Sequence, residues 1–208
     1  MIPSLSYWTD GARGRGRRDQ LEVIERLFRG GVELVVLRER DWSGAEWVAC
    51  AKRLEKLRRE GLRVLASRRL DAARALGLDG VHLGAEAVPV AEARAFLGPR
   101  ALVGYSAHEP GEARHAAEAG ASYVTLSPIY PSSSHPDRPP RGCAWLAAAA
   151  RELPVPVLAL GGVTAERVAE LRAAGAAGVV AISALGAAPD PEAAAREFRR
   201  ALADEEGR

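Results

Sequence analysis

The chain has 208 residues, and its 27 acidic and 29 basic residues leave a formal net charge of +2. A net charge near zero argues against a general polyanion binder, so we expect no nucleic-acid partner. Two cysteines, Cys50 and Cys143, are too few and too far apart for a disulfide framework or a metal-ligand cluster. We see no signal peptide and no run of about 18 apolar residues, so we expect a cytoplasmic protein with no membrane partner.

The composition is poor in thermolabile residues, with no asparagine, one glutamine and one methionine. This scarcity predicts a thermophilic source, although a strong coding bias would produce the same pattern. The length allows one large domain or two small ones, and it is sufficient for a substantial core.

Short β-branched segments alternate with longer segments rich in Ala, Arg, Glu and Leu. In chain order, the predicted strand and helix pairs are residues 5–9 and 19–29, 34–38 and 43–59, 63–66 and 70–76, 80–83 and 89–96, 102–105 and 110–119, 123–126 and 143–152, 157–160 and 164–174, and 178–182 and 191–204. Strict alternation indicates a parallel sheet. Eight pairs predict an α/β fold, a single-domain (β/α)8 TIM barrel over residues 1–208, with short loops and a frayed tail at 203–208.

In such a barrel, functional residues follow the carboxyl ends of the strands. The seventh predicted strand runs into Gly161 and Gly162, and the eighth ends at Ile182 and Ser183. Bare backbone N–H groups beside a helix N-terminus form a phosphate cradle, so we expect these four residues to bind a phosphate. The alternative is that the two glycines only permit a tight turn.

The longest predicted loop, residues 127–142, carries hydroxyls, a histidine and two arginines. A long loop in a barrel with short loops is typically functional and often acts as a lid. Its hydroxyls, including Ser132 and Ser134, can donate hydrogen bonds to a phosphate or diphosphate. The alternative is a flexible loop rich in Pro and Ser.

A charged segment, residues 38–40, ends the second predicted strand. Charged residues at this position are natural at the mouth of a site. Arg38 or Arg40 either binds an anion or forms a salt bridge with Glu39.

Two histidines lie on or near strands. His82 lies within the fourth predicted strand, where a hydrogen-bonded structural role is favoured over catalysis. Ser106 and His108 follow the fifth-strand segment, and His108 either lines the site or caps a helix. No HxxxH, CxxC or carboxylate cluster indicates zinc, so we expect no metal ligands.

Seven segments in order, covering nearly the whole chain, resemble the thiamine-phosphate synthase superfamily. They are residues 8–10 (WTD), 37–40 (LRER), 78–84 (LDGVHLG), 103–108 (VGYSAH), 123–132 (YVTLSPIYPS), 158–163 (LALGGV) and 180–183 (VAIS). The resemblance implies one of two activities. One branch is a synthase that couples a pyrimidine diphosphate to a thiazole phosphate with Mg²⁺. The other resembles TenI, a metal-free thiazole phosphate tautomerase.

The chain departs from the synthase pattern at several polar positions. Val36 and Arg40 stand where that branch has Gln and Lys on either side of the strand-two arginine. Ser67 and Arg68 replace an Asn-Asp pair whose Asp binds metal, and Ala87 replaces a second aspartate ligand. Because Mg²⁺ needs hard oxygen ligands, these changes argue against a synthase and imply no cofactor unless the synthase reading holds. Arg68 would repel Mg²⁺, although an arginine could itself neutralise a diphosphate.

The TenI-like branch matches the chain at segment 37–40 but differs after the sixth strand. That branch has an acid/base histidine where this chain has Pro128. Proton transfer needs a group that titrates near neutrality, so His135 is the first substitute catalytic residue and His108 the second.

We therefore predict a TenI-like protein of thiamine biosynthesis that binds a small phosphorylated thiazole and acts as a metal-independent tautomerase, an isomerase. Arg38, Arg40 or Arg68 would bind a substrate carboxylate or a second anionic group. One alternative is a divergent thiamine-phosphate synthase. The other is a non-catalytic barrel that binds thiamine phosphates and regulates a partner. A homodimer would be unsurprising for a small barrel.

Overall fold

The computed structural model describes residues 2–9, 17–39, 41–132 and 137–206. Within these ranges the strands are β1 (Leu5–Trp8), β2 (Leu34–Leu37), β3 (Arg63–Ser67), β4 (Gly80–Leu83), β5 (Leu102–Ala107), β6 (Tyr123–Leu126), β7 (Val157–Leu160) and β8 (Gly178–Ala181). The helices are α1 (Arg17–Arg29), α2 (Gly44–Arg59), α3 (Leu70–Ala75), α4 (Val90–Leu97), α5 (Pro110–Glu118), α6 (Gly142–Glu152), the 3-10 helix η1 (Ala165–Arg167), α7 (Val168–Ala173), α8 (Ser183–Gly186) and α9 (Pro191–Glu206).

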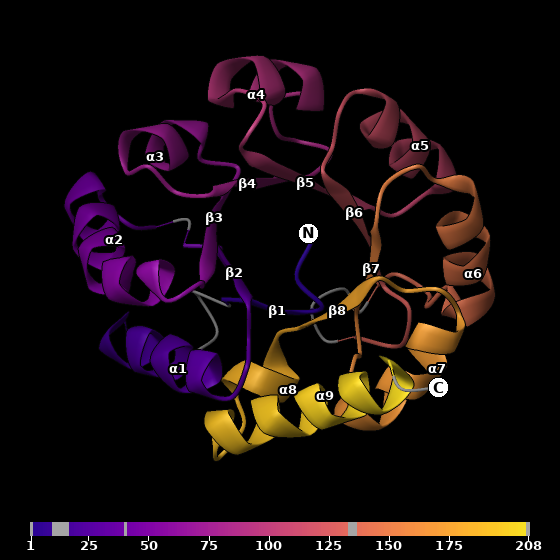
Figure 1. Cartoon of the computed structure of the whole chain (residues 1–208). Helices are drawn as coiled ribbons and strands as arrows, with labels where there is room; N and C mark the ends of the chain where they lie inside the picture. The colour runs from indigo at the N-terminus through magenta and orange to yellow at the C-terminus, as the bar shows by residue number, and fades with distance from the viewer. Residues whose placement is uncertain (1, 10–16, 40, 133–136, 207–208) are drawn as a thin grey trace.

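The strands form one closed parallel barrel. Each strand pairs with the next in sequence, and β1 pairs with β8 at Leu5 and Val179 to close the ring. Figure 1 looks along the barrel axis and shows the helices as an outer ring around the strands. The predicted single-domain (β/α)8 barrel is confirmed.

Side chains of each strand alternate between the barrel interior and the layer beneath the helices, as a period of two requires. In β1, Leu5 and Tyr7 pack beneath the helices, whereas Trp8 packs inside the barrel. The interior is filled by large apolar side chains, namely Trp8, Leu34, Val36, Leu65, Tyr123, Leu158, Leu160 and Val180. The barrel centre is therefore a packed core, and chemistry is confined to its ends.

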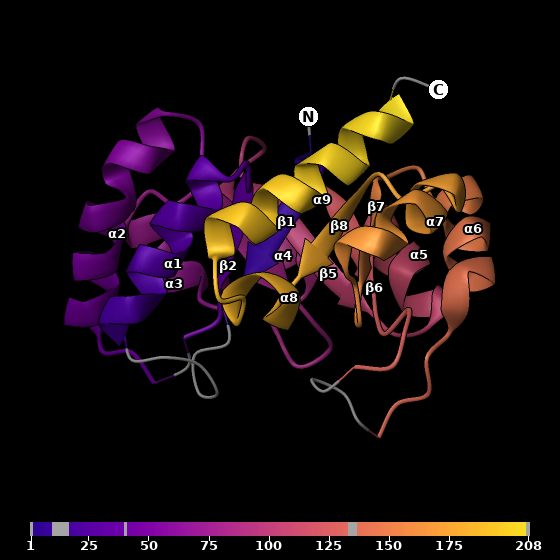
Figure 2. The same ribbon diagram turned by 90° about the horizontal axis from the view of Figure 1, so that it is seen from below.

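The two ends of the barrel differ. Ile2, which precedes β1, packs against the interior cluster, and the N-terminus lies within the ring in Figure 1. In Figure 2 the carboxyl ends of the strands and the described parts of the loop after β6 lie at one end, while α9 ends at the other. The amino end of the barrel is thus covered by the chain, and the carboxyl end is available for a site.

Some element boundaries differ from the predictions. The 3-10 helix η1 forms the first turn of the predicted helix 164–174, and the short helix α8 follows β8 where none was predicted. Helix α9 extends to Glu206, although fraying was predicted from residue 203. Phe198 and Leu202, two residues of α9, are buried and hold its second half on the barrel. Among the described helices, none has the length and apolar character needed to cross a membrane.

Candidate functional site

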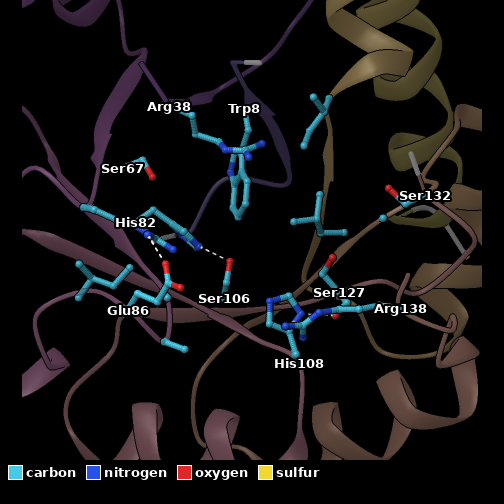
Figure 3. A pocket seen from close by; sticks show the side chains of 17 residues that line it. Trp8, Arg38, Ser67, His82, Glu86, Ser106, His108, Ser127, Ser132 and Arg138 are labelled. Atoms are coloured by element: carbon cyan, nitrogen blue, oxygen red, sulfur yellow. Dashed lines mark hydrogen bonds and ion pairs between the residues drawn. The ribbon is translucent and has the colours of Figure 1, made fainter. Parts of the chain in front are cut away.

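A cavity of about 240 Å³ opens at the carboxyl ends of the strands. We call it the arginine lobe, because Arg38, Arg68 and Arg138 line it. Its other lining side chains come mainly from the ends of β1 and β3–β8 and the loops after them: Trp8, Ser67, His82, Leu83, Ala85, Glu86, Ser106, His108, Ser127, Ser132, Leu160 and Ile182. Figure 3 shows Arg38 and Trp8 on one side, His108 and Arg138 on the opposite side, with His82 and Ser106 between them.

His82, at the centre of β4, is the middle of a hydrogen-bonded line in the wall of the arginine lobe. Its Nδ1 lies 3.0 Å from the Tyr123 hydroxyl, and its Nε2 lies 3.0 Å from Ser106 Oγ. Ser106 Oγ lies 3.4 Å from Thr125 Oγ1. The Trp8 ring packs on the imidazole with centroids 4.3 Å apart. The structural role that the sequence favoured for His82 agrees with this arrangement.

The protonation of this line follows from its burial. Burial, with the nearby charge of Arg38, lowers the pKa of His82 to about 3, so the ring is neutral near pH 7. Burial also raises the pKa of Tyr123, so its hydroxyl keeps its proton. A neutral imidazole has one donor and one acceptor nitrogen. Two tautomers satisfy both contacts: either Tyr123 donates to Nδ1 and Nε2–H donates to Ser106 Oγ, or Ser106 donates to Nε2 and Nδ1–H donates to the Tyr123 oxygen.

Gly104 on β5 makes room for this line. A Cβ at Gly104 would lie 2.3 Å from Tyr123 Cζ and 2.5 Å from His82 Nδ1. Real Cβ atoms do not approach heavy atoms so closely. The absence of a side chain at Gly104 therefore allows the rings from β4 and β6 to meet across β5.

Arg68 directly follows β3 and has a left-handed backbone, with φ of 62°, which is rare for a residue other than glycine. Its backbone N–H donates to the carbonyl of His82 at 3.0 Å, and its Nη1 lies 3.0 Å from Glu86 Oε2. The Arg68 side chain is 38% exposed and that of Glu86 is 81% exposed. An ion pair this exposed contributes up to about 1 kcal/mol, and the left-handed backbone costs roughly 1–2 kcal/mol. The pair alone does not explain why an arginine is held in this conformation.

Arg38 and His108 line the lobe from different strands. The Arg38 backbone N–H donates to Thr9 Oγ1 at 2.8 Å, and its guanidinium lies 6.0 Å from the centroid of the Trp8 ring. His108 Nδ1 lies 2.6 Å from the Ser127 carbonyl oxygen. Because a carbonyl only accepts, His108 carries a proton on Nδ1, and this contact fixes the orientation of its ring.

A second cavity, of about 430 Å³, lies beside the first at the ends of β7 and β8. We call it the glycine lobe. It is lined by Pro131, Ser132, Leu160, Gly161, Gly162, Val163, Thr164, Arg167, Val180, Ala181, Ile182, Ser183 and Ala184. Four residues line both lobes, namely Ser132, Leu160, Gly161 and Ile182. The lobes therefore adjoin along one shared wall.

Gly161 and Gly162 both have positive φ, 96° and 62°, so the turn after β7 requires glycine. The loop after β6 packs directly on them: a Cβ at Gly161 would lie 2.7 Å from Pro128 Cα, and one at Gly162 would lie 2.5 Å from the Pro131 carbonyl oxygen. Within the described part of the chain, neither glycine N–H donates a hydrogen bond to the protein. The tight turn and the phosphate cradle, which the sequence left as alternatives, are compatible at this position.

Arg167 brings a positive charge to the glycine lobe. Its guanidinium lies 4.2 Å from the centroid of the Tyr130 ring, and its Nη1 donates to the carbonyl of Gly162. The Tyr130 hydroxyl in turn donates to Glu170 Oε2 at 2.7 Å. These contacts hold the Arg167 guanidinium beside the two glycines.

The described residues at the carboxyl end of the barrel do not fit a magnesium ion. Among the described residues, no group of three or more His, Cys, Asp or Glu side chains is placed to hold a metal. Glu86 is the one carboxylate among the described residues that line the arginine lobe, and it is paired with Arg68. Mg²⁺ prefers oxygen ligands in octahedral geometry at about 2.1 Å, and an adjacent guanidinium opposes its binding.

The structure brings most of the predicted site residues together. Arg38, Arg68, Ser106 and His108 line the arginine lobe, Gly162 and Ser183 line the glycine lobe, and Ser132, Gly161 and Ile182 line both. Arg40, Ser134 and His135 lie outside the described residues. The binding and catalytic roles assigned to all of these residues stay predictions.

Sequence reasoning did not assign several lining residues to the site, among them Trp8, Arg167 and Arg138. Trp8 could have been found from strand alternation, because it points to the same side of β1 as Ser6. Arg167 could have been found as a basic residue in the first turn after the two glycines. Arg138 belongs to a loop whose fold carries no periodic signal, so only its charge indicated a role.

Comparison with known proteins identifies the family. The family model for thiamine monophosphate synthase matches residues 9–185. The chain belongs to this family. Because the match runs from just after β1 into α8, it includes every residue that lines the two lobes except Trp8.

Individual relatives agree with the family assignment. A Geobacter sulfurreducens protein that carries a provisional thiamine-phosphate synthase name is 44% identical over 96% of this chain and 92% of its own length. The thiamine-phosphate synthase of Roseiflexus sp. (strain RS-1) is 37% identical over 96% of this chain and 85% of its own. The structure of thiamine phosphate pyrophosphorylase from Pyrococcus furiosus is 27% identical, with a TM-score of 0.87 over 97% of this chain and 96% of that chain.

These relatives correct the predicted function. The prediction of a TenI-like thiazole tautomerase is wrong, because relatives matching nearly the whole chain are named synthases. The prediction gave most weight to a few side chains, above all Arg68 and Ala87. Those side chains do not determine the core or the turn at Gly161 and Gly162. The findings favour the synthase that the sequence analysis kept as an alternative.

Proposed function

We propose that this protein is a thiamine-phosphate synthase, which joins a pyrimidine diphosphate to a thiazole phosphate and releases diphosphate. The observation that carries the proposal is the pair of adjoining lobes, which share the wall formed by Ser132, Leu160, Gly161 and Ile182. A reaction that joins two molecules needs two binding sites in contact, whereas an isomerase needs one. The synthase names of the relatives support the same reaction.

The glycine lobe suits the thiazole phosphate. The N–H groups of Gly161 and Gly162 can donate to phosphate oxygens, as backbone groups do in other anion cradles. Arg167 supplies a positive charge beside them, and Ser183 starts the turn after β8. Phosphate sites formed after strands seven and eight recur in (β/α)8 barrels.

The arginine lobe suits the pyrimidine diphosphate. Its three guanidinium groups face a single carboxylate among the described lining residues, so the lobe favours an anion. Ser106 Oγ can form a hydrogen bond with the pyrimidine ring. Ser127 Oγ, in the same wall, is buried and has no hydrogen-bond partner within the described residues. A ligand that forms a hydrogen bond with Ser127 would offset the free-energy penalty of burying that unpaired hydroxyl.

The reaction requires positioning and charge neutralisation from these residues. The thiazole ring nitrogen forms a bond to the methylene carbon of the pyrimidine, and the bond from that carbon to the diphosphate oxygen breaks. The bonding electrons leave with diphosphate, so no proton has to pass between protein and substrate. We therefore assign His108 to binding and orientation in this reaction, and no step requires His135 as an acid or a base.

Purified protein incubated with both phosphorylated substrates tests the proposal. We expect thiamine phosphate and diphosphate to appear in equal amounts, measured by chromatography and phosphorus NMR, and neither to appear when one substrate is omitted. Isomerisation of a thiazole carboxylate phosphate without coupling would contradict the proposal. Tight binding of both substrates with no turnover, measured by calorimetry, would favour a non-catalytic barrel instead.

A further inference from the structure

We propose that Arg68 binds the diphosphate of the pyrimidine substrate directly, so that this site neutralises the leaving group without a divalent metal ion. The inference rests on the proposed synthase activity and names the residue that carries its charge chemistry. It follows from the mismatch between the residues present at the carboxyl end of the barrel and those that a metal ion needs.

The first observation is the charge balance of the arginine lobe. Three arginines line it, namely Arg38, Arg68 and Arg138. Among the described lining residues the one carboxylate is that of Glu86, so three positive charges face one negative charge. A divalent cation placed there would be repelled by the guanidinium groups, whereas a diphosphate would be attracted by them. The lobe therefore already has the charge that a diphosphate requires.

The second observation is the backbone of Arg68. Among the described residues other than glycine, Arg68 alone has a positive φ. Strained backbone conformations persist where the surrounding structure imposes them, and they cluster at ligand sites. The Arg68 N–H donates to the His82 carbonyl, which fixes the backbone of Arg68 to the end of the β3–β4 ladder. The side chain lines the arginine lobe from this position.

The third observation is the partner of Arg68. Glu86 lies on the loop after β4 and is mostly exposed, so the ion pair at 3.0 Å is open to solvent. An exposed pair contributes little, and a diphosphate can therefore replace Glu86 as the partner of Arg68. Glu86 would hold the guanidinium in place before the substrate binds.

These features give Arg68 a defined part in the reaction. As the carbon–oxygen bond to diphosphate breaks, the electron pair moves onto the leaving group. The guanidinium N–H groups can donate to two phosphate oxygens at once and stabilise that charge as it develops. Arg38 lies in the same lobe and adds a second positive charge.

Binding of inorganic diphosphate, measured by calorimetry in EDTA, tests the assignment without turnover. We expect the unmodified protein to bind diphosphate in EDTA, and added Mg²⁺ to tighten the binding less than twofold. Arg68→Asn should weaken binding at least tenfold, because Asn tolerates a left-handed backbone but has no charge. Arg68→Lys should recover part of the affinity. Arg114→Asn, on the outer face of α5, should bind as the unmodified protein does.

Turnover with both substrates gives the second readout. We expect the same rate in EDTA and in millimolar Mg²⁺. The double substitution Arg68→Asp with Ala87→Asp should lower the rate in EDTA at least tenfold and make it rise with Mg²⁺. These variants need circular dichroism spectra matching the unmodified protein before their rates are compared.

The outcomes separate the two proposals. Diphosphate binding and turnover that both require Mg²⁺ in the unmodified protein would overturn the assignment of Arg68 while leaving the synthase proposal intact. Unchanged diphosphate affinity in Arg68→Asn would also overturn it. No thiamine phosphate under either condition, with Arg68-dependent diphosphate binding in EDTA, would instead overturn the synthase proposal and keep Arg68 as an anion-binding residue.

Discussion

The two lobes offer an anion different kinds of groups. The glycine lobe offers backbone N–H groups, and its shape depends on positive φ at Gly161 and Gly162 and on the loop packed against them. The arginine lobe offers charged and polar side chains that project from strand ends, such as Arg38 and Arg68. A side chain at a strand end can be replaced without changing the barrel, but a Cβ at either glycine would collide with the neighbouring loop.

This difference gives the two lobes different constraints. The glycine turn is constrained by the fold itself, because the chain can follow that path only with glycine. The arginine lobe is constrained only by the chemistry it performs. The residues Arg68 and Ala87, where the resemblance implies two aspartates, are therefore compatible with relatives that match nearly the whole chain and are named thiamine-phosphate synthases.

The largest expected effect is at Gly161. Gly161→Ala places a methyl group 2.7 Å from Pro128 Cα and disturbs the N–H groups of the turn. Since each hydrogen bond to a charged group contributes about 1.5–3 kcal/mol, we expect kcat/KM to fall on the order of a hundredfold. Steady-state kinetics with the thiazole phosphate varied would measure this.

Gly61→Ala is the matched control. Gly61 also has a positive φ, 114°, but a Cβ there meets nothing within 4 Å. We expect a loss of stability of about 1 kcal/mol and unchanged kinetics. Equal activity of Gly161→Ala and Gly61→Ala would contradict the claim that the glycine lobe works through its backbone groups.

Gly104→Ala probes the packing behind the arginine lobe. The added Cβ would lie 2.3 Å from Tyr123 Cζ, so we expect the free energy of unfolding to fall by about 2–3 kcal/mol. Urea denaturation would measure the change. Gly111→Ala in α5, where a Cβ meets nothing within 4 Å, should be neutral or stabilising by up to about 1 kcal/mol. A neutral result at Gly104 would contradict the buried line through His82.

The pH dependence of stability tests the neutral state of His82. Its pKa is lowered from 6.5 to about 3 by burial, so the unfolded chain binds more protons than the folded chain between these values. Stability from this source is fully present above pH 6.5 and is lost as the pH falls towards 3. Between pH 6 and pH 4, the unmodified protein should lose about 2 kcal/mol more than His82→Asn. If the free energy of unfolding fell equally with pH in the unmodified protein and in His82→Asn, His82 would be accessible to protons in the folded state.

Arg167→Ala gives the smallest expected effect, because the proposed phosphate site relies mainly on backbone N–H groups. Loss of one charged contact should raise KM for the thiazole phosphate about tenfold and leave kcat nearly unchanged. Arg196→Ala on the exposed side of α9 should leave both constants unchanged. An effect as large as that of Gly161→Ala would mean that this lobe also depends mainly on a side chain.

The fold was predictable from the sequence because local signals agree with one another. Alternating apolar strands and amphipathic helices specified eight units, and the glycines at 161 and 162 marked the position of the glycine lobe. The position of Ser106 after the fifth predicted strand placed it at the carboxyl end of the barrel. These features depend on backbone geometry and on a period of two, both of which can be read from a single chain.

The contacts within the site were less predictable. The partners of His82 come from β5 and β6, and the space for them depends on Gly104, so the hydrogen-bonded line exists only once the barrel closes. The positive φ of Arg68 also has no local signal, because arginine is not a residue that favours it. The tautomerase prediction was wrong because it gave a few side chains at the site more weight than the similarity of the whole chain to its relatives.

The most direct test of the central claim is the coupling reaction itself. The unmodified protein, incubated with the pyrimidine diphosphate and the thiazole phosphate in Mg²⁺ and separately in EDTA, should form thiamine phosphate and diphosphate in equal amounts under both conditions. Failure to form thiamine phosphate in either condition, with both substrates bound, would contradict the proposed function.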